Sequence, residues 1–247
     1  MLIIANWKAY VEDGARAKAL ARSAKRLAGR YPKIQVVLAP SAPHLGMLAP
    51  GNTSRVAFAA QDISATVGGA ETGEVPAQIY ADLGATYAII GHSERRAAGE
   101  TNAEIAEKLQ HAIAHGLAPV LCVGERIRDA ESEYLSYVRE QVSVALSPLA
   151  EGDRRKIVFA YEPVWAIGKS ANEAIDPADL SEMLLYIRKV ALELMPGKSA
   201  STKVLYGGSV EPDDIRGLAG GSGVDGFLVG HASIDAKIFS ALIKALV

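Results

Sequence analysis

The sequence has almost no cysteine. Cys122 is the only one in 247 residues, so an internal disulfide is impossible, which is typical of proteins of the reducing cytoplasm. No apolar run approaches the roughly 20 residues that a membrane-spanning helix needs. The first residues also lack the basic start and the longer apolar stretch of a signal peptide. We therefore expect a cytoplasmic protein that has no membrane partner.

The sequence also has little net charge. Its 26 basic and 28 acidic side chains give a formal net charge of −2, so we expect no nucleic acid and no anionic membrane surface as partner. Hydrophobic residues make up 49% of the chain and charged residues 22%, as in globular proteins with a sizeable core. The length suits one large domain or two small ones, and no linker divides the chain.

What the sequence does contain is a repeat of short apolar runs separated by segments of helical character. The runs are rich in Val, Ile and Leu and do not alternate with polar residues, as expected for strands that are buried on both faces. The eight predicted strands are 2–5, 36–39, 56–60, 87–90, 118–123, 157–161, 203–206 and 226–229. The predicted helices are 13–29, 42–48 (the weakest), 101–116, 131–149, 177–194, 211–218 and 232–246.

Strict alternation of strand and helix implies parallel strands joined by right-handed crossovers. Eight such units in 247 residues predict an α/β fold, a (β/α)8 barrel that forms one domain over residues 1–247. An open, doubly wound sheet is the structural alternative. Thr101 to Glu104 has the pattern of a capping box, and Asp176-Pro177 the pattern of a helix start.

Polar residues gather at the carboxyl ends of the predicted strands, where barrels of this kind carry out their chemistry. Taken singly, each has an ordinary interpretation as a turn residue, a helix cap or a surface ion pair that contributes little. Closure of the barrel would bring them together, which favours function. They are Asn6 and Lys8, then His92, Ser93 and Glu94, then Glu162, then Gly207, Gly208 and Ser209, and finally Gly230 and His231.

These residue types can act together on a carbonyl compound. A carboxylate such as Glu162, shielded by the apolar segment 164–168, can serve as a general base. An imidazole can polarise a carbonyl or move a proton, and an ammonium and an amide can stabilise an oxyanion. Backbone N–H groups around Ser209 and Gly230 can hold a phosphate. The set suits proton abstraction next to the carbonyl of a small sugar phosphate.

Seven short blocks run in order from residue 6 to residue 230: 6–8 (NWK), 72–74 (TGE), 91–96 (GHSERR), 122–125 (CVGE), 161–168 (YEPVWAIG), 206–210 (YGGSV) and 225–230 (DGFLVG). In these blocks, and in their order, the sequence resembles the triosephosphate isomerase family along almost its whole length. The resemblance implies interconversion of glyceraldehyde 3-phosphate and dihydroxyacetone phosphate through an enediolate, in glycolysis and gluconeogenesis, with no cofactor and no metal.

The resemblance also implies a role for each polar residue. Glu162 would move the proton between two carbons, and His92 would handle protons at the oxygens. Lys8 would balance the charge of phosphate and enediolate, Asn6 would donate to the substrate oxygen, and Glu94 would support Lys8 and the histidine. This family is the standard example of a glutamate base, a neutral histidine and a closing loop, so those features rest on the resemblance.

A lid and a phosphate site are implied in the same way. Trp165 would belong to the hinge of the lid and meet Glu125 when the lid is open. The lid would consist of Pro163, Val164, Trp165, Ala166, Ile167, Gly168, Lys169, Ser170 and Ala171. The substrate and its phosphate would be held by Asn6, Lys8, Gly168, Ser209, Gly230 and His231.

Three departures from the family pattern stand out. The lid tip after Gly168 is about two residues shorter than usual. His231 stands where the family usually has a second glycine, and we expect it in an ordinary helix-start conformation. The third departure is Glu71, which replaces a bulky residue in the loop that inserts into a partner subunit. The loop keeps its full length, so we expect a homodimer in which Thr72 reaches the neighbour's site; a monomer is the alternative.

Two other functions compete with the isomerase. A barrel that acts on a different phosphosugar should carry different polar residues after the first, fourth and sixth strands. A catalytically silent barrel, kept for binding or assembly, has no need of Asn6, Lys8, His92 and Glu162 together. The retained set therefore favours the isomerase.

Overall fold

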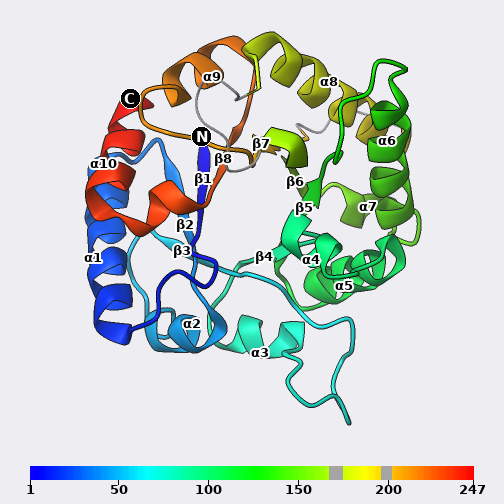
Figure 1. The fold of residues 1–247 in the computed structure, drawn as a ribbon. Helices are drawn as coiled ribbons and strands as arrows, with labels where there is room; N and C mark the ends of the chain where they lie inside the picture. The colour runs from blue at the N-terminus through cyan, green and yellow to red at the C-terminus, as the bar shows by residue number, and fades with distance from the viewer. Residues whose placement is uncertain (167–174, 196–201) are drawn as a thin grey trace.

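The computed structural model describes residues 1–166, 175–195 and 202–247. Within them, eight strands form a closed parallel barrel in chain order (Figure 1). The pairing of the first strand with the eighth closes the barrel, which confirms the (β/α)8 fold and excludes the open sheet. The strands are β1 (Leu2–Asn6), β2 (Gln35–Ala39), β3 (Ala57–Ala60), β4 (Tyr87–Ile90), β5 (Ala118–Val123), β6 (Val158–Tyr161), β7 (Val204–Tyr206) and β8 (Gly226–Val229).

Helices surround this barrel on the outside (Figure 1). They are α1 (Gly14–Arg30), α2 (Ala42–Leu48), α3 (Ala77–Asp82), α4 (Ser93–Ala97), α5 (Asn102–Ala114), α6 (Glu133–Leu146), α7 (Glu151–Arg154), α8 (Pro177–Glu193), α9 (Ile215–Gly221) and α10 (Ala236–Ala245). Among the described residues, the 3-10 helices η1 (Val164–Ala166) and η3 (His231–Ile234) follow β6 and β8.

Local capping explains where several helices begin. The capping box at Thr101 and Glu104 is present in full, and Asp176 accepts the N–H of Ala178 at the start of α8, as predicted. The predicted helix 232–246 is broken because the side chain of Asp235 accepts the N–H groups of Lys237 and Ile238, so that a new helix starts there. The short helices α3, α4 and α7 are absent from the sequence-based prediction.

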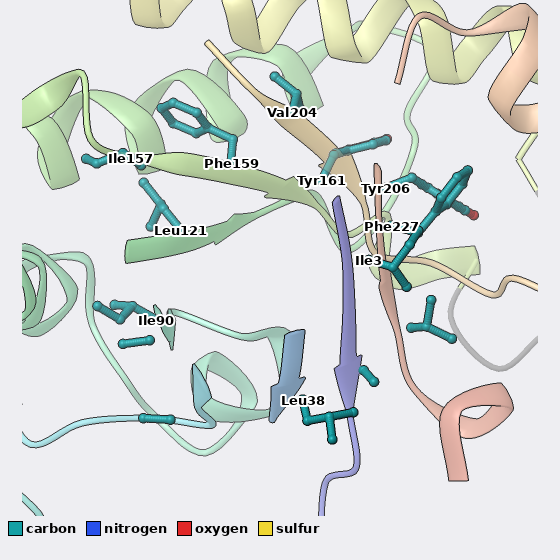
Figure 2. Close-up of a cluster of buried hydrophobic side chains, with 14 of the residues drawn as sticks. Ile3, Leu38, Ile90, Leu121, Ile157, Phe159, Tyr161, Val204, Tyr206 and Phe227 are labelled. Atoms are coloured by element: carbon teal, nitrogen blue, oxygen red, sulfur yellow. The ribbon is translucent and has the colours of Figure 1, made fainter. Parts of the chain in front are cut away.

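The strands lack alternation because both of their faces are buried. One layer of side chains fills the barrel interior and includes Ile4, Val37 and Leu228. The other layer packs against the helices and includes the aromatic side chains of Phe159 and Phe227 (Figure 2). Both layers are apolar, so the polar side chains are left to the ends of the strands, where the loops begin.

Candidate active site

A cavity of about 350 Å³ opens at the carboxyl ends of the strands. Its walls come from the segments that follow β1, β4, β6, β7 and β8, so barrel closure assembles it from five separate parts of the chain. Of the residues predicted to act on substrate or phosphate, it brings together Asn6, Lys8, His92, Glu162, Ser209, Gly230 and His231. Gly168 lies outside the described residues, and Glu94 does not line this cavity.

Glu162 is fixed at the mouth of the barrel by a close approach of two strand ends. Its N–H donates to the carbonyl oxygen of Val123 at 2.8 Å. A Cβ at Gly124 would lie 1.9 Å from the carbonyl oxygen of Glu162, so only glycine permits this approach. The Glu162 side chain is buried, with 3% of it exposed. A carboxylate is thus held in a largely water-free place at the edge of a cavity.

Both oxygens of the Glu162 carboxylate have partners. Oε2 accepts the backbone N–H of Ser93 at 2.8 Å, and Oε1 lies 3.1 Å from Nε2 of His92. These contacts place the carboxylate against the start of α4.

The ring of His92 has a polar partner at each nitrogen. Its Nδ1 accepts the N–H of Glu94 at 3.2 Å, because His92 caps the N-terminus of α4. A nitrogen that accepts carries no proton, so Nε2 is the ring nitrogen that can donate. It lies 3.1 Å from Oε1 of Glu162.

Lys8 has an unusual backbone conformation. Its φ is +46°, which is uncommon for a residue with a side chain and persists only where the surroundings enforce it. The Lys8 N–H donates to Oδ1 of Asn6 at 3.0 Å. Gln61 donates through Nε2 to the carbonyl oxygens of Lys8 and Ala39, at 2.9 and 2.8 Å. These bonds hold the ammonium side chain over the cavity.

Glu94 contacts the site from its rim. Its Oε1 accepts from Nζ of Lys8 at 2.7 Å, and 62% of its side chain is exposed. Partial burial raises the pKa of Glu94, but the hydrogen bond from Lys8, the charge of Lys8 and then that of His92 outweigh it, so that the pKa lies below its ordinary value. Glu94 therefore stays charged and orients Lys8.

The start of the predicted lid is anchored by a buried acid. Trp165 lies in η1 and donates through Nε1 to Oε1 of Glu125 at 2.8 Å, as predicted. The hydroxyl of Tyr161 donates to the same oxygen at 2.8 Å. Burial, followed by the charge of Glu125, raises the pKa of Tyr161. Of the predicted lid, Pro163 to Ala166 are described, and Ile167 to Ala171 lie outside the described residues.

The end of the cavity at β7 and β8 carries the predicted phosphate ligands. The Ser209 hydroxyl donates to the carbonyl oxygen of Ala166 at 3.3 Å. His231 begins η3 and, as expected, has no positive φ. The ring of Tyr10 meets that of His231 edge-on, with centroids 5.9 Å apart. Tyr10 also lines the cavity, but the prediction from sequence did not include it. Its position two residues after Lys8 could have indicated that it lies near the site.

Two glycines also shape the cavity. A Cβ at Gly207 would lie 2.9 Å from Cγ of Glu162, and one at Gly208 would lie 2.2 Å from the hydroxyl of Tyr206. Both glycines line the cavity. The sequence placed them after the seventh strand but did not indicate that their missing side chains make room for the carboxylate and for the phenol.

Thr72 lies apart from this cavity. It is exposed in the loop between β3 and α3, which extends away from the barrel (Figure 1). Among the described residues, no three metal-binding side chains gather at one point. Nor does any described helix combine the length and the apolar sequence that crossing a membrane requires.

Comparison with known proteins decides the family. The family model described as triosephosphate isomerase matches residues 1–246. The chain belongs to the triosephosphate isomerase family. It has triosephosphate isomerase activity, the conversion of an aldose into a ketose and back, as the resemblance implied.

Curated members of the triosephosphate isomerase family match over 77% to 99% of the chain. The triosephosphate isomerase of Moorella thermoacetica is 38% identical over 245 residues, which cover 98% of this chain and 97% of that protein. That of Magnetococcus marinus is 38% identical over 255 residues, covering 99% and 98%. That of Thermus thermophilus is 43% identical over 194 residues, covering 77% of each chain.

Proposed function

We propose that the chain interconverts glyceraldehyde 3-phosphate and dihydroxyacetone phosphate with Glu162 as the base and without metal or cofactor. The observation that carries the proposal is the contact of 3.1 Å between Nε2 of His92 and Oε1 of Glu162 at one wall of the cavity. It joins a carboxylate that can take a proton to an imidazole that can donate one.

The proton transfer would run in two steps. Glu162 takes the proton from the carbon next to the carbonyl and returns it to the neighbouring carbon, while the electrons pass through an enediolate. The neutral His92 donates its Nε2–H to the oxygen that gains charge, and takes part in moving the proton between the two oxygens. A neutral imidazole suits this task because its pKa as a proton donor is not far from the pKa of the enediol oxygen.

Lys8 and Asn6 would stabilise the developing negative charge. Both line the cavity, and the Lys8 conformation is held by hydrogen bonds before any ligand binds. Preorganised donors stabilise a transition state without a cost of reorganisation at the moment of reaction. Glu94 would act by orienting Lys8, with which it makes an ion pair of 2.7 Å.

The phosphate would bind at the β7 and β8 end of the cavity. We assign backbone N–H groups of Ser209, Gly230 and His231 to it, together with that of Gly168 from the lid. The lid, residues 163–171, would close over the substrate and keep water from the enediolate phosphate, which otherwise eliminates its phosphate. The Trp165–Glu125 hydrogen bond supports a hinge at the start of this lid.

We also propose a homodimer in the cytoplasm. The loop that carries Thr72 is exposed and extends from the barrel (Figure 1), so it can insert into a second copy, where Thr72 would lie beside Asn6 and Lys8. Glu71 in this loop favours a weaker contact than a bulky apolar residue would give. The lack of disulfides supports the cytoplasmic location.

The test is turnover of glyceraldehyde 3-phosphate, coupled to reduction of the dihydroxyacetone phosphate formed. Glu162→Gln should abolish turnover, and Glu162→Asp should lower it on the order of 10²-fold, because misplacing a reacting group by about 1 Å costs that much. Glu211→Gln is the matched control, since Glu211 lines the same cavity and should retain turnover. Full activity of Glu162→Asp would refute the assignment of the base.

A folded wild-type chain without turnover would favour the silent barrel. The shortened lid tip and His231 would then be the first places to restore the family pattern.

A further inference from the structure

The outer face formed by α1 and α10 carries a concentration of positive charge. The two helices pack side by side on the outside of the barrel (Figure 1). Neither contains an aspartate or a glutamate: α1 has six basic residues in 17, and α10 has two lysines in 10. These eight cations leave a formal charge of −10 on the rest of a chain whose total is −2.

The basic residues of α1 include a stripe that winds slowly around the helix. Lys18, Arg22, Arg26 and Arg30 follow one another at intervals of four residues and are all exposed. Residues at this spacing are neighbours on a helix, and like charges there destabilise it. An ordinary solvated helix face intersperses carboxylates, which this one does not. The stripe is about 18 Å long, because each residue adds about 1.5 Å.

The second helix forms a groove with the C-terminal half of this stripe. A hollow of about 510 Å³ lies between the helices, with Arg26 and Arg30 on the α1 side and Lys237 and Lys244 on the α10 side. This volume is within the range of about 300 to 1,000 Å³ that is typical of small-molecule sites. No acidic residue lines it.

The groove also contains two hydroxyl groups, and an acid lies at the start of α10. Ser23 and Ser240 also line the groove and can donate hydrogen bonds to an anion. The acid Asp235 caps the start of α10, next to the groove residues Ala236 and Lys237. Its carboxylate accepts the N–H groups of Ile238 and Lys237, and these bonds, followed by the charges of Lys237 and Arg16, lower its pKa. Asp235 is thus engaged by its own helix.

The shape and chemistry of the groove indicate the kind of anion. A row of cations on two walls matches a linear polyanion, and arginine pairs with phosphate through two parallel N–H bonds. Single-stranded nucleic acid would also need aromatic faces on which bases stack, and no aromatic side chain lines the groove. The nearby Tyr31 lies under the guanidinium of Arg30, 5.6 Å from it.

We propose that the groove between α1 and α10 binds a linear chain of phosphate groups, that is, inorganic polyphosphate. The low net charge of the whole protein does not oppose this, because a local patch sets the field that a ligand meets. None of the groove residues lines the active-site cavity. Binding should therefore be separable from isomerase activity.

The experiment measures the affinity of the full chain for short-chain polyphosphate by calorimetry over a range of salt concentrations. About four phosphate contacts predict that affinity falls about 50-fold between 50 and 200 mM salt, using the slope for single-stranded chains. The triple variant Arg26→Gln, Arg30→Gln, Lys237→Gln should lose about tenfold or more of the affinity at low salt. Its isomerase activity should equal that of the wild type, which also shows that it folds.

The matched control removes the same charge elsewhere. Lys156→Gln, Lys189→Gln and Lys203→Gln alter three exposed lysines outside α1 and α10 and should leave polyphosphate affinity within about twofold, because only contacted phosphates release counterions. The charge-preserving pair Arg26→Lys, Arg30→Lys should bind more tightly than the glutamine triple variant but less tightly than the wild type, because lysine keeps the charge and loses the two parallel N–H bonds.

Three results would overturn the proposal. The first is no measurable binding by the wild type at low salt. The second is an equal loss of affinity in both triple variants, which would mean that net charge alone is responsible. The third is tighter binding of a single-stranded RNA homopolymer than of polyphosphate to the same groove, which would assign the face to nucleic acid.

Discussion

A single methyl group at position 207 tests the geometry of the active site. Gly207 has no positive φ, so alanine fits its backbone. The new Cβ would lie 2.9 Å from Cγ of Glu162 and 3.6 Å from its Oε1. Carbon atoms need about 3.5 Å or more, so the Glu162 side chain must move by roughly 0.5 to 1 Å. Displacements of a reacting group near 1 Å lower the catalytic rate on the order of 10²-fold. We therefore expect Gly207→Ala to lower kcat by about 10- to 100-fold.

The assay is the coupled isomerisation of glyceraldehyde 3-phosphate, with a thermal melt of the same protein. Gly217→Ala is the matched control, because a Cβ there meets nothing within 4 Å and alanine in the helix α9 should stabilise it by about 0.5 to 1 kcal/mol. The control should keep wild-type kcat. If Gly207→Ala folds and also keeps wild-type kcat, the reasoning that this wall positions Glu162 is refuted.

Three further predictions concern stability and substrate binding. Lys108→Met should lower the free energy of unfolding by about 3 to 5 kcal/mol, because Lys108 is 5% exposed and neutralises Asp62 and Glu100. Adding Glu100→Gln should restore part of this free energy, as measured by urea titration. His231→Gly should raise KM for the phosphorylated substrate and leave kcat unchanged in steady-state assays, because it changes only the proposed phosphate end. Glu94→Gln should lower the melting temperature most above the ordinary glutamate pKa of 4.5. The difference should shrink as pH falls through the lower pKa of the folded state.

Each of these predictions has a clear contrary outcome. A Lys108→Met protein as stable as the wild type would mean that the buried charges find other partners. A His231→Gly protein with a changed kcat would place the histidine closer to the reacting carbons than we propose. A Glu94→Gln difference that is independent of pH would show that the ion pair with Lys8 contributes nothing to stability.

The sequence by itself determined the barrel. The eight strands were predictable because burial on both faces requires uninterrupted apolar runs, and strict alternation with helices leaves few topologies. The capping box at Thr101 was readable because it depends on residues within one turn. The polar residues at strand ends, Glu162 among them, were found by the same logic, since position along a strand fixes the end of the barrel at which they lie.

Other features depend on residues far apart in the chain, and only the tertiary structure decided them. The partners of the two His92 ring nitrogens are Glu94 and Glu162, and the need for glycine at position 207 follows from the place of the Glu162 side chain. The basic groove could not be predicted from the net charge, because net charge averages over the whole surface. Its two helices, α1 and α10, lie at opposite ends of the sequence and meet only when the barrel closes. Sequence patterns report the local preferences of the chain, and closure through β1 and β8 determines which of its distant parts touch.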